Sequence, residues 1–184
     1  DLNGWTPAQV AINADKVRAT ELLLMHGGTD KVAAVNKSGG YGAAPLQDAA
    51  ASNSISVARW LLDNGANLYA TNEVTGDTAL HRAAINGCDP AVRLLVDEEH
   101  KRCKESGAEP KLLTMGNKLS HTCLTMAVMS GRVSTTRILL TYANKPGYIG
   151  NGLSFQDFVN AKEEVAGFTA LHYAANRTEE GARA

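Results

Sequence analysis

The stretch Gly76-Asp-Thr-Ala-Leu-His-Arg-Ala83 decides the fold, because its pattern occurs five times along the 184-residue chain. The other copies are Gly4-Trp-Thr-Pro-Ala-Gln-Val-Ala11, Gly42-Ala-Ala-Pro-Leu-Gln-Asp-Ala49, Ser120-His-Thr-Cys-Leu-Thr-Met-Ala127 and Gly167-Phe-Thr-Ala-Leu-His-Tyr-Ala174. Their third positions are separated by 38, 34, 44 and 47 residues and are Thr6, Ala44, Thr78, Thr122 and Thr169. Self-similarity at this spacing indicates a stack of small supersecondary units.

A second apolar triplet follows each third position at a constant offset in the four complete units. The triplets are Leu22-Leu-Leu24, Trp60-Leu-Leu62, Leu94-Leu-Val96 and Ile138-Leu-Leu140. Because the offset does not change, the extra residues fall between units and not inside them. Each unit is therefore predicted to be a pair of helices with the triplet as its buried stripe. A Thr at the third position caps the first helix, and Gly27 and Gly65 end the second helices of their units.

These motifs resemble the ankyrin repeat, whose signature is Thr-Pro-Leu-His-x-Ala. The resemblance implies an all-α fold, a solenoid of helix-turn-helix units with β-hairpin fingers. It implies about five repeats, the last incomplete, in a single domain over residues 1–184. Their approximate ranges are 3–36, 41–74, 75–119, 120–165 and 166–184. The chain lacks an initiator Met and stops soon after an apolar helical pattern begins, so we expect a segment of a longer protein.

Two insertions interrupt the pattern, at approximately 98–118 and 143–158. Glu99 and Ala143 occupy the places of the terminating glycines, so the second helix of the third unit is predicted to continue about two turns, towards Gly107. Residues 153–158 are predicted to form a short helical turn. Because both insertions fall between units, we expect them to tolerate shortening, including deletion of 107–116.

The composition argues against several classes of function. The formal net charge of −1 gives no sign of a nucleic-acid-binding surface. No apolar run reaches the roughly 20 residues that cross a bilayer, so we expect no membrane insertion. Three cysteines without a paired pattern are typical of free thiols in a reducing compartment, and we expect a cytoplasmic protein.

The sequence likewise gives no set of residues for catalysis, and we expect no enzyme, cofactor or small-molecule substrate. His81 and His172 hold the signature position, where the resemblance implies a structural hydrogen bond between neighbouring units. His100 with Cys103 and His121 with Cys123 offer zinc-type ligands, but their spacing is not that of a paired zinc motif, so no metal is expected. The segment Ser38-Gly-Gly-Tyr-Gly42 is interpreted as a finger and not a phosphate-binding loop.

The remaining function is binding of another protein, as an interaction module or scaffold. The resemblance implies that partners contact the fingers and the concave face of the first helices. The expected face residues beside the signature position are Val10, Asp48, Arg82, Met126 and Tyr173, and one turn further on Ser52, Asn86 and Ser130. Finger candidates are Lys37, Tyr41, Tyr69, Asn72, Glu73, Lys162 and Glu163. The alternative is an accessory array of a larger enzyme, channel or pathogen effector, whose chemistry lies outside these residues.

The register itself can be tested by truncating the apolar stripe. Leu61→Ala and Leu95→Ala are each expected to lower the free energy of unfolding by about 2–5 kcal/mol, because both remove a buried leucine. Urea or thermal unfolding measures the loss. Changes below about 0.5 kcal/mol would show that the register is wrong, since only exposed sites give effects that small.

Overall fold

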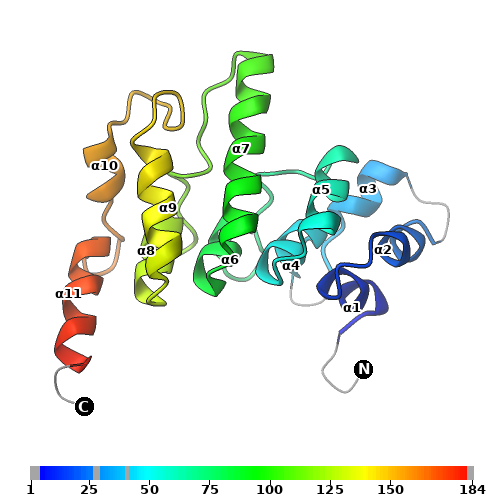
Figure 1. The fold of residues 1–184 in the computed structure, drawn as a ribbon, viewed down its shortest axis with the longest axis horizontal. Helices are drawn as coiled ribbons and strands as arrows, with labels where there is room; N and C mark the ends of the chain where they lie inside the picture. Colours follow the sequence, from blue (N-terminus) through cyan, green and yellow to red (C-terminus); the bar gives the residue numbers. More distant parts are fainter. Residues whose placement is uncertain (1–4, 27–29, 40–41, 182–184) are drawn as a thin grey trace.

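The computed structural model describes residues 5–26, 30–39 and 42–181 and shows them as a row of helices (Figure 1). Gly27 and Tyr41, named above for a helix end and a finger, lie outside these ranges. The helices are α1 Pro7–Asn13, α2 Val17–Leu24, α3 Lys31–Asn36, α4 Pro45–Ala51, α5 Ile55–Asp63, α6 Ala79–Asn86, α7 Asp89–Ser106, α8 Cys123–Met129, α9 Val133–Ala143, α10 Phe155–Val159 and α11 Ala170–Gly181.

The helices pair into consecutive units, as the sequence predicts. α1 packs on α2, α4 on α5, α6 on α7 and α8 on α9, and α11 begins the fifth unit. The first helices α1, α4, α6, α8 and α11 pack side by side, and the second helices α2, α5, α7 and α9 form a parallel row. The array runs from the N-terminal helices at the right of Figure 1 to α11 at the left. The predicted helical solenoid is confirmed.

The apolar triplets form the core in three of the four complete units. Leu61, Leu95 and Leu139 are fully buried. In the first unit the prediction is wrong, because Leu22 and Leu23 are 58% and 41% exposed. There Val17, Leu24 and Met25 pack on the core, which leaves the first two residues of the triplet, Leu22 and Leu23, facing outwards.

The start of each first helix is built from a cap residue and the residue three positions later. The Oγ1 atoms of Thr6, Thr78 and Thr122 accept backbone N–H bonds from Gln9, His81 and Thr125, as predicted for N-caps. These bonds satisfy donors that would otherwise have no partner in the helix. In the second unit, Ala44 has no such oxygen, and Gln47 Oε1 instead accepts from the Ala44 N–H at 2.9 Å.

The side chain three positions after the cap also joins one unit to the next. Gln47 Nε2 donates to the carbonyls of Asp77, at 2.9 Å, and Ala70, at 3.0 Å. His81 Nδ1 lies 3.2 Å from the Thr78 N–H, and its Nε2 lies 2.9 Å from the His121 carbonyl. The neutral tautomer with the proton on Nε2 satisfies both bonds. The inter-unit role that the resemblance implies is thus seen at His81, whereas His172 contacts Thr169 of its own unit.

The fingers follow a hairpin path but are hydrogen-bonded turns and not paired strands. Each turn has a backbone bond across its base. These bonds run from Asn72 N to Asp77 O at 2.8 Å, from Asn117 N to His121 O at 3.0 Å and from Glu163 N to Phe168 O at 3.0 Å. The isolated antiparallel bridge between Gly116 and Thr122 is the sole β pairing within the described ranges. Short turns leave too few residues for a ladder to form.

The first insertion packs into the core, which argues against the prediction that residues 107–116 can be deleted. α7 does run on to Ser106 and ends at Gly107, whose φ of +72° favours glycine. The chain then turns back, and Leu112 and Leu113 are fully buried. Glu99 Oε1 accepts the backbone N–H bonds of Lys111, at 2.8 Å, and Leu112, at 2.7 Å. The carboxylate that replaces the terminating glycine therefore anchors the returning segment.

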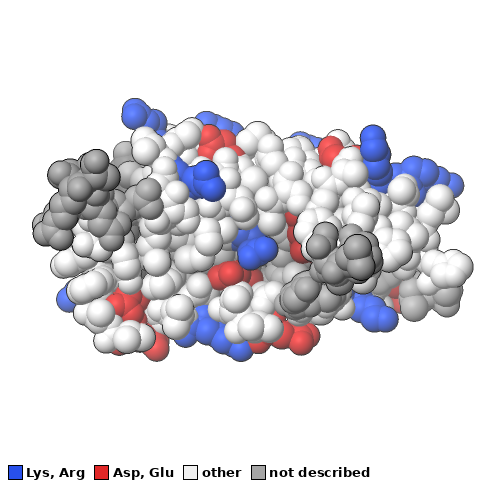
Figure 2. All heavy atoms as spheres, turned by 90° about the horizontal axis from the view of Figure 1, so that it is seen from below, with Lys and Arg blue, Asp and Glu red and all other residues white. Residues whose placement is uncertain are grey.

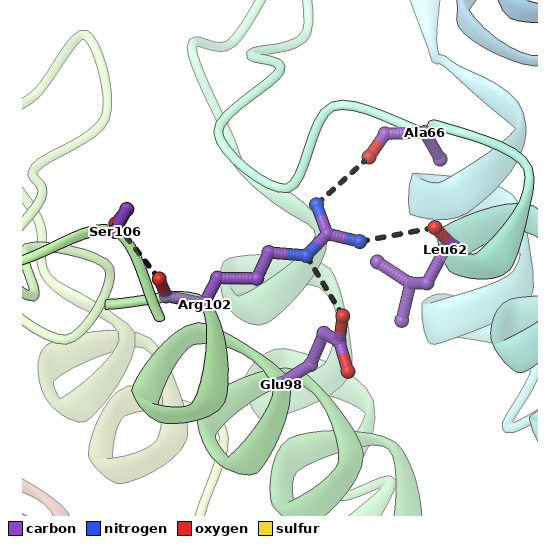
Figure 3. A network of polar contacts seen from close by, with 5 residues as sticks. All are labelled: Leu62, Ala66, Glu98, Arg102 and Ser106. Carbon is purple, nitrogen blue, oxygen red and sulfur yellow. Dashed lines mark hydrogen bonds and ion pairs between the residues drawn. The ribbon is translucent and has the colours of Figure 1, made fainter. Parts of the chain in front are cut away.

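The extension of α7 also reaches back to the preceding unit (Figure 3). Arg102 donates to the carbonyls of Leu62, at 3.0 Å, and Ala66, at 3.4 Å, and its Nε forms an ion pair with Glu98 at 2.7 Å. A cation beside the carbonyls at and just after the C-terminal end of α5 is favourable. The extra turns of α7 thus fasten the second unit to the third.

The second insertion packs against the first. His100 of α7 stacks on Tyr148 with ring centroids 4.1 Å apart, and its Nδ1 lies 3.0 Å from the Gly147 carbonyl. The predicted short helix is present as α10, with Ser154 as its cap and Phe158 in the core. The sequence did not predict α3, a short helix capped by Asp30 that buries Val35.

The buried return of the first insertion predicts a large effect of truncation there. Leu112→Ala is expected to lower the free energy of unfolding by about 2–5 kcal/mol, because a fully buried leucine leaves a cavity. Leu153→Ala, in the second insertion and 42% exposed, is the matched control and should change it little. Urea unfolding of both variants tests the packing. If both variants lose equally little free energy of unfolding, residues 107–116 are not part of the core.

His81 gives the array a pH-dependent contact. Burial lowers the pKa of His81, so the folded state disfavours the protonated imidazole that the unfolded chain takes up below about pH 6.5. The stability that the neutral ring contributes is therefore present above that pH and is lost as the pH falls towards the folded-state pKa.

His81→Gln removes the titrating group and keeps both bonds, as Gln47 does at the equivalent position of the second unit. The variant is expected to lose less free energy of unfolding than the wild type between pH 7 and 5. The two losses should differ by less than about 1.4 kcal/mol per pH unit, the limit for one titrating group. Urea unfolding at each pH measures the difference in stability between the two proteins. The carboxylates are the same in both proteins, so their contributions to this difference cancel. Parallel curves for the two proteins would contradict the assignment.

Candidate protein-binding surface

Four of the predicted face residues lie in one row along the first helices. Asp48, Arg82, Met126 and Tyr173 occupy the same position of α4, α6, α8 and α11, which pack side by side. All four are half-buried rather than fully exposed. Val10 continues the row on α1 and is 46% exposed. We call these five residues the helix face.

The centre of the helix face is polar. Gln9 Nε2 donates to Asp48 Oδ2 at 3.1 Å across the first two units. Burial raises the pKa of Asp48, and the bond from Gln9 and the positive charge of Arg82 oppose that shift. An acidic and a basic side chain thus lie near one another on adjacent helices, and Asp48 is held by its bond from Gln9.

The C-terminal end of the helix face is aromatic. The Tyr173 ring meets the ring of His121 edge-on at 5.9 Å and the ring of Phe168 at 5.7 Å. Phe168 also stacks on His172 at 5.5 Å. Phe168 and Leu171 are 45% and 70% exposed, so this end presents apolar surface to solvent.

The second predicted row is polar and its contacts lie within the array. Ser52 is exposed, with its Oγ 2.5 Å from Asn13 Oδ1, and links α4 to α1. Asn86 is exposed and donates to the Arg82 carbonyl at 2.8 Å. Ser130 is half-buried at the end of α8.

Two of the finger candidates do not project from the array. Tyr69 packs against the core beneath the first insertion, with the Lys111 ammonium 4.5 Å from its ring centroid. Burial and the negative charge of Glu99 raise the pKa of Tyr69. Asn72 is half-buried, and its Oδ1 accepts the N–H bonds of Val74 and Thr75. These two side chains build the fold, because their polar atoms and rings are used inside it.

The other finger candidates include both solvent-exposed side chains and a side chain used inside the fold. Glu73, Lys37 and Lys162 are exposed. Glu163 is buried, and its carboxylate accepts backbone N–H bonds from Val165, Ala166 and Phe168. The sequence has no local signal that separates these inward acceptors from outward charges.

The face of the array seen from below carries both signs of charge. Figure 2 shows this face as largely uncharged, with basic and acidic side chains interspersed. Among the described residues, no three His, Cys, Asp or Glu side chains lie close enough to hold a metal ion. The same part of the chain contains no helix long and apolar enough to span a bilayer. Cys123 is fully buried, which raises the pKa of its thiol to about 12.

Two grooves open on the array away from the helix face. One, of about 760 Å³, lies beside α9 and is lined by Val128, Leu140 and Phe155 with Arg132 and Arg137. The other, of about 640 Å³, lies between the two insertions. The sequence did not predict either groove, since each is formed by segments from different units.

Comparison with known proteins agrees with the repeated units. Residues 46–96 match the family described as ankyrin repeats (many copies). Over 96 residues, 52% of this chain, the sequence is 32% identical to the transient receptor potential cation channel subfamily A member 1 homolog of Caenorhabditis elegans. The match spans only 7% of the length of that relative. The family match identifies residues 46–96 as ankyrin repeats, and the stacked helix pairs on either side of them have the same architecture.

Proposed function

We propose that this array is a protein-interaction module that binds a partner protein across the helix face and the fingers. The observation that carries the proposal is the continuous row of Asp48, Arg82, Met126 and Tyr173 on neighbouring helices. The row is half-buried, so its side chains are already partly ordered before a partner arrives. Ordered side chains reduce the entropy that association costs.

The chemistry of the row suits protein recognition. Arg, Tyr and Met are enriched in protein interfaces, and Arg and Tyr dominate their binding energy. Asp48 and Arg82 give a charged pair for orientation, and Tyr173 with Phe168 gives an aromatic anchor. A module of this kind binds and does not catalyse, and we propose a cytoplasmic scaffold without cofactor, metal or nucleic acid.

The alternative, an accessory array within a larger protein, is supported by the likeness to a cation channel homolog over about half of this chain. In that case the array regulates or docks a larger protein whose activity lies elsewhere. The sequence of the full-length transcript separates the two possibilities. An enzyme, channel or effector domain on the same transcript supports the alternative, and the absence of all three supports an independent module.

The proposal is tested with the double variant Arg82→Ala/Tyr173→Ala. Proteins recovered by affinity purification on the wild-type array are expressed again and titrated by calorimetry. The double variant is expected to weaken binding by more than about 1 kcal/mol, because it removes the charged and aromatic centres of the row. Thermal unfolding should show an intact fold with a modest loss of stability, because both side chains are only half-buried and Tyr173 also contacts His121 of the preceding unit.

The matched control is His172→Ala, which neighbours Tyr173 but contacts Thr169 and Phe168 within its own unit. It should lower stability more than affinity. Unchanged affinity and unchanged stability in the double variant would move the binding surface away from the helix face. Lost stability with retained binding would make the two side chains structural.

A further inference from the structure

Three consecutive fingers carry an exposed aliphatic side chain at the same place. Val74, Leu119 and Val165 are 69%, 53% and 82% exposed. Single apolar residues on a surface need no explanation. These three, however, recur three or four residues before the cap threonine of successive units, and each directly follows a charged residue. We call Val74, Leu119 and Val165 the tip row.

Each member of the tip row is held by the same local bond. Its backbone N–H donates to the side chain two residues earlier, which is Asn72 at 2.8 Å, Asn117 at 3.0 Å and Glu163 at 2.6 Å. Side chains of this type stabilise turns by such contacts. The aliphatic groups are therefore presented by ordered turns and not by loose loops.

The fingers also have a defined spacing. The Lys118 N–H donates to the Thr75 carbonyl at 3.0 Å, which joins the fingers beside Val74 and Leu119. The helices that follow the three fingers, α6, α8 and α11, pack side by side. Packed helices lie about 8–10 Å apart, so the tip row that precedes them is expected to have an aliphatic group at about the same spacing.

A polyproline II helix matches this spacing. It has three residues per turn and rises about 3.1 Å per residue, so every third side chain lies on one edge about 9 Å from the next. Such a segment is also preformed, which lowers the entropy that it loses on binding. An α-helix, rising about 5.4 Å per turn, places its successive contacts too close together.

We propose that the tip row binds a polyproline II segment of a partner protein with an aliphatic side chain at every third position. This inference rests on the proposed function and names the kind of partner. Glu73 and Glu164 are exposed beside the outer members of the row, whereas the Lys118 ammonium donates to the Glu73 carbonyl at 2.5 Å. The segment that fits best therefore has basic residues next to its first and last aliphatic positions.

The test uses two fluorescein-labelled synthetic peptides of identical composition. One, Arg-Leu-Pro-Pro-Leu-Pro-Pro-Leu-Arg, has leucine at every third position, and the other, Arg-Leu-Pro-Leu-Pro-Leu-Pro-Pro-Arg, at every second. Fluorescence anisotropy with the whole chain is expected to give a Kd about tenfold lower for the first peptide, the effect of burying one more aliphatic group. Equal affinities, or no binding of the first peptide, would overturn the proposal.

The site is mapped with Val74→Ser, Leu119→Ser and Val165→Ser. Each is expected to raise the Kd of the first peptide about tenfold. Val133→Ser is the matched control, because Val133 is 71% exposed but lies at the start of α9, outside the row. Thermal unfolding should be the same for all four, since each replaced side chain points to solvent. Unchanged affinity in the three tip variants would refute the site.

The outcome is distinguishable from a failure of the proposed function. The first peptide can fail to bind, or the tip variants can leave its Kd unchanged, while Arg82→Ala/Tyr173→Ala still weakens binding of the recovered partner. In that case the tip row is refuted and the helix face stands. If the tip variants weaken the peptide and the double variant leaves partner affinity unchanged, the tip row stands as the binding surface. If the tip variants leave peptide affinity unchanged and the double variant leaves partner affinity unchanged, both proposals are refuted.

Discussion

The hydrogen bonds of one buried polar side chain in each of the first helices α4 and α6 hold the middle of the array together. Gln47 and His81 each satisfy the backbone N–H at the start of their own helix and a carbonyl in the finger of the next unit. An unpaired polar group at these buried sites would cost about 1–3 kcal/mol. The start of one helix therefore fixes the position of the following finger, and the stack inherits its register from one unit to the next.

This constraint explains which departures from the repeat are tolerated. Glutamine replaces histidine in the second unit because its amide also carries an acceptor and a donor at the required reach. Thr125 is too short to reach the next unit, and the contact there passes instead between His121 and Tyr173. The helix face thus contributes to the stacking of the last unit as well as to the surface.

The insertions are part of the fold because they satisfy polar groups that the extended α7 exposes. Burial raises the pKa of Glu99, yet its carboxyl accepts two backbone N–H bonds, which offset the cost of desolvation. Arg102 supplies donors to the end of α5. Leu112 and Leu113 of the first insertion are fully buried, so the array gains core where the repeat alone has only a loop.

The sequence by itself determined the features that depend on local spacing. The threonine caps of α1, α6 and α8, the offset of the triplets, the length of α7 to Gly107 and the short helix α10 all follow from neighbouring residues, because caps and helix ends are local interactions. Most of the helix face was predictable for the same reason, since its residues hold one position in each unit.

Only the tertiary structure decided where distant segments meet. The burial of Leu112, the position of Tyr69 under Lys111 and the exposure of Leu22 depend on contacts between different units. The inward turn of Asn72 and Glu163 likewise depends on the folded path of each finger. No local pattern encodes these contacts, because the free energy of a buried side chain is set by the neighbours that the fold brings to it.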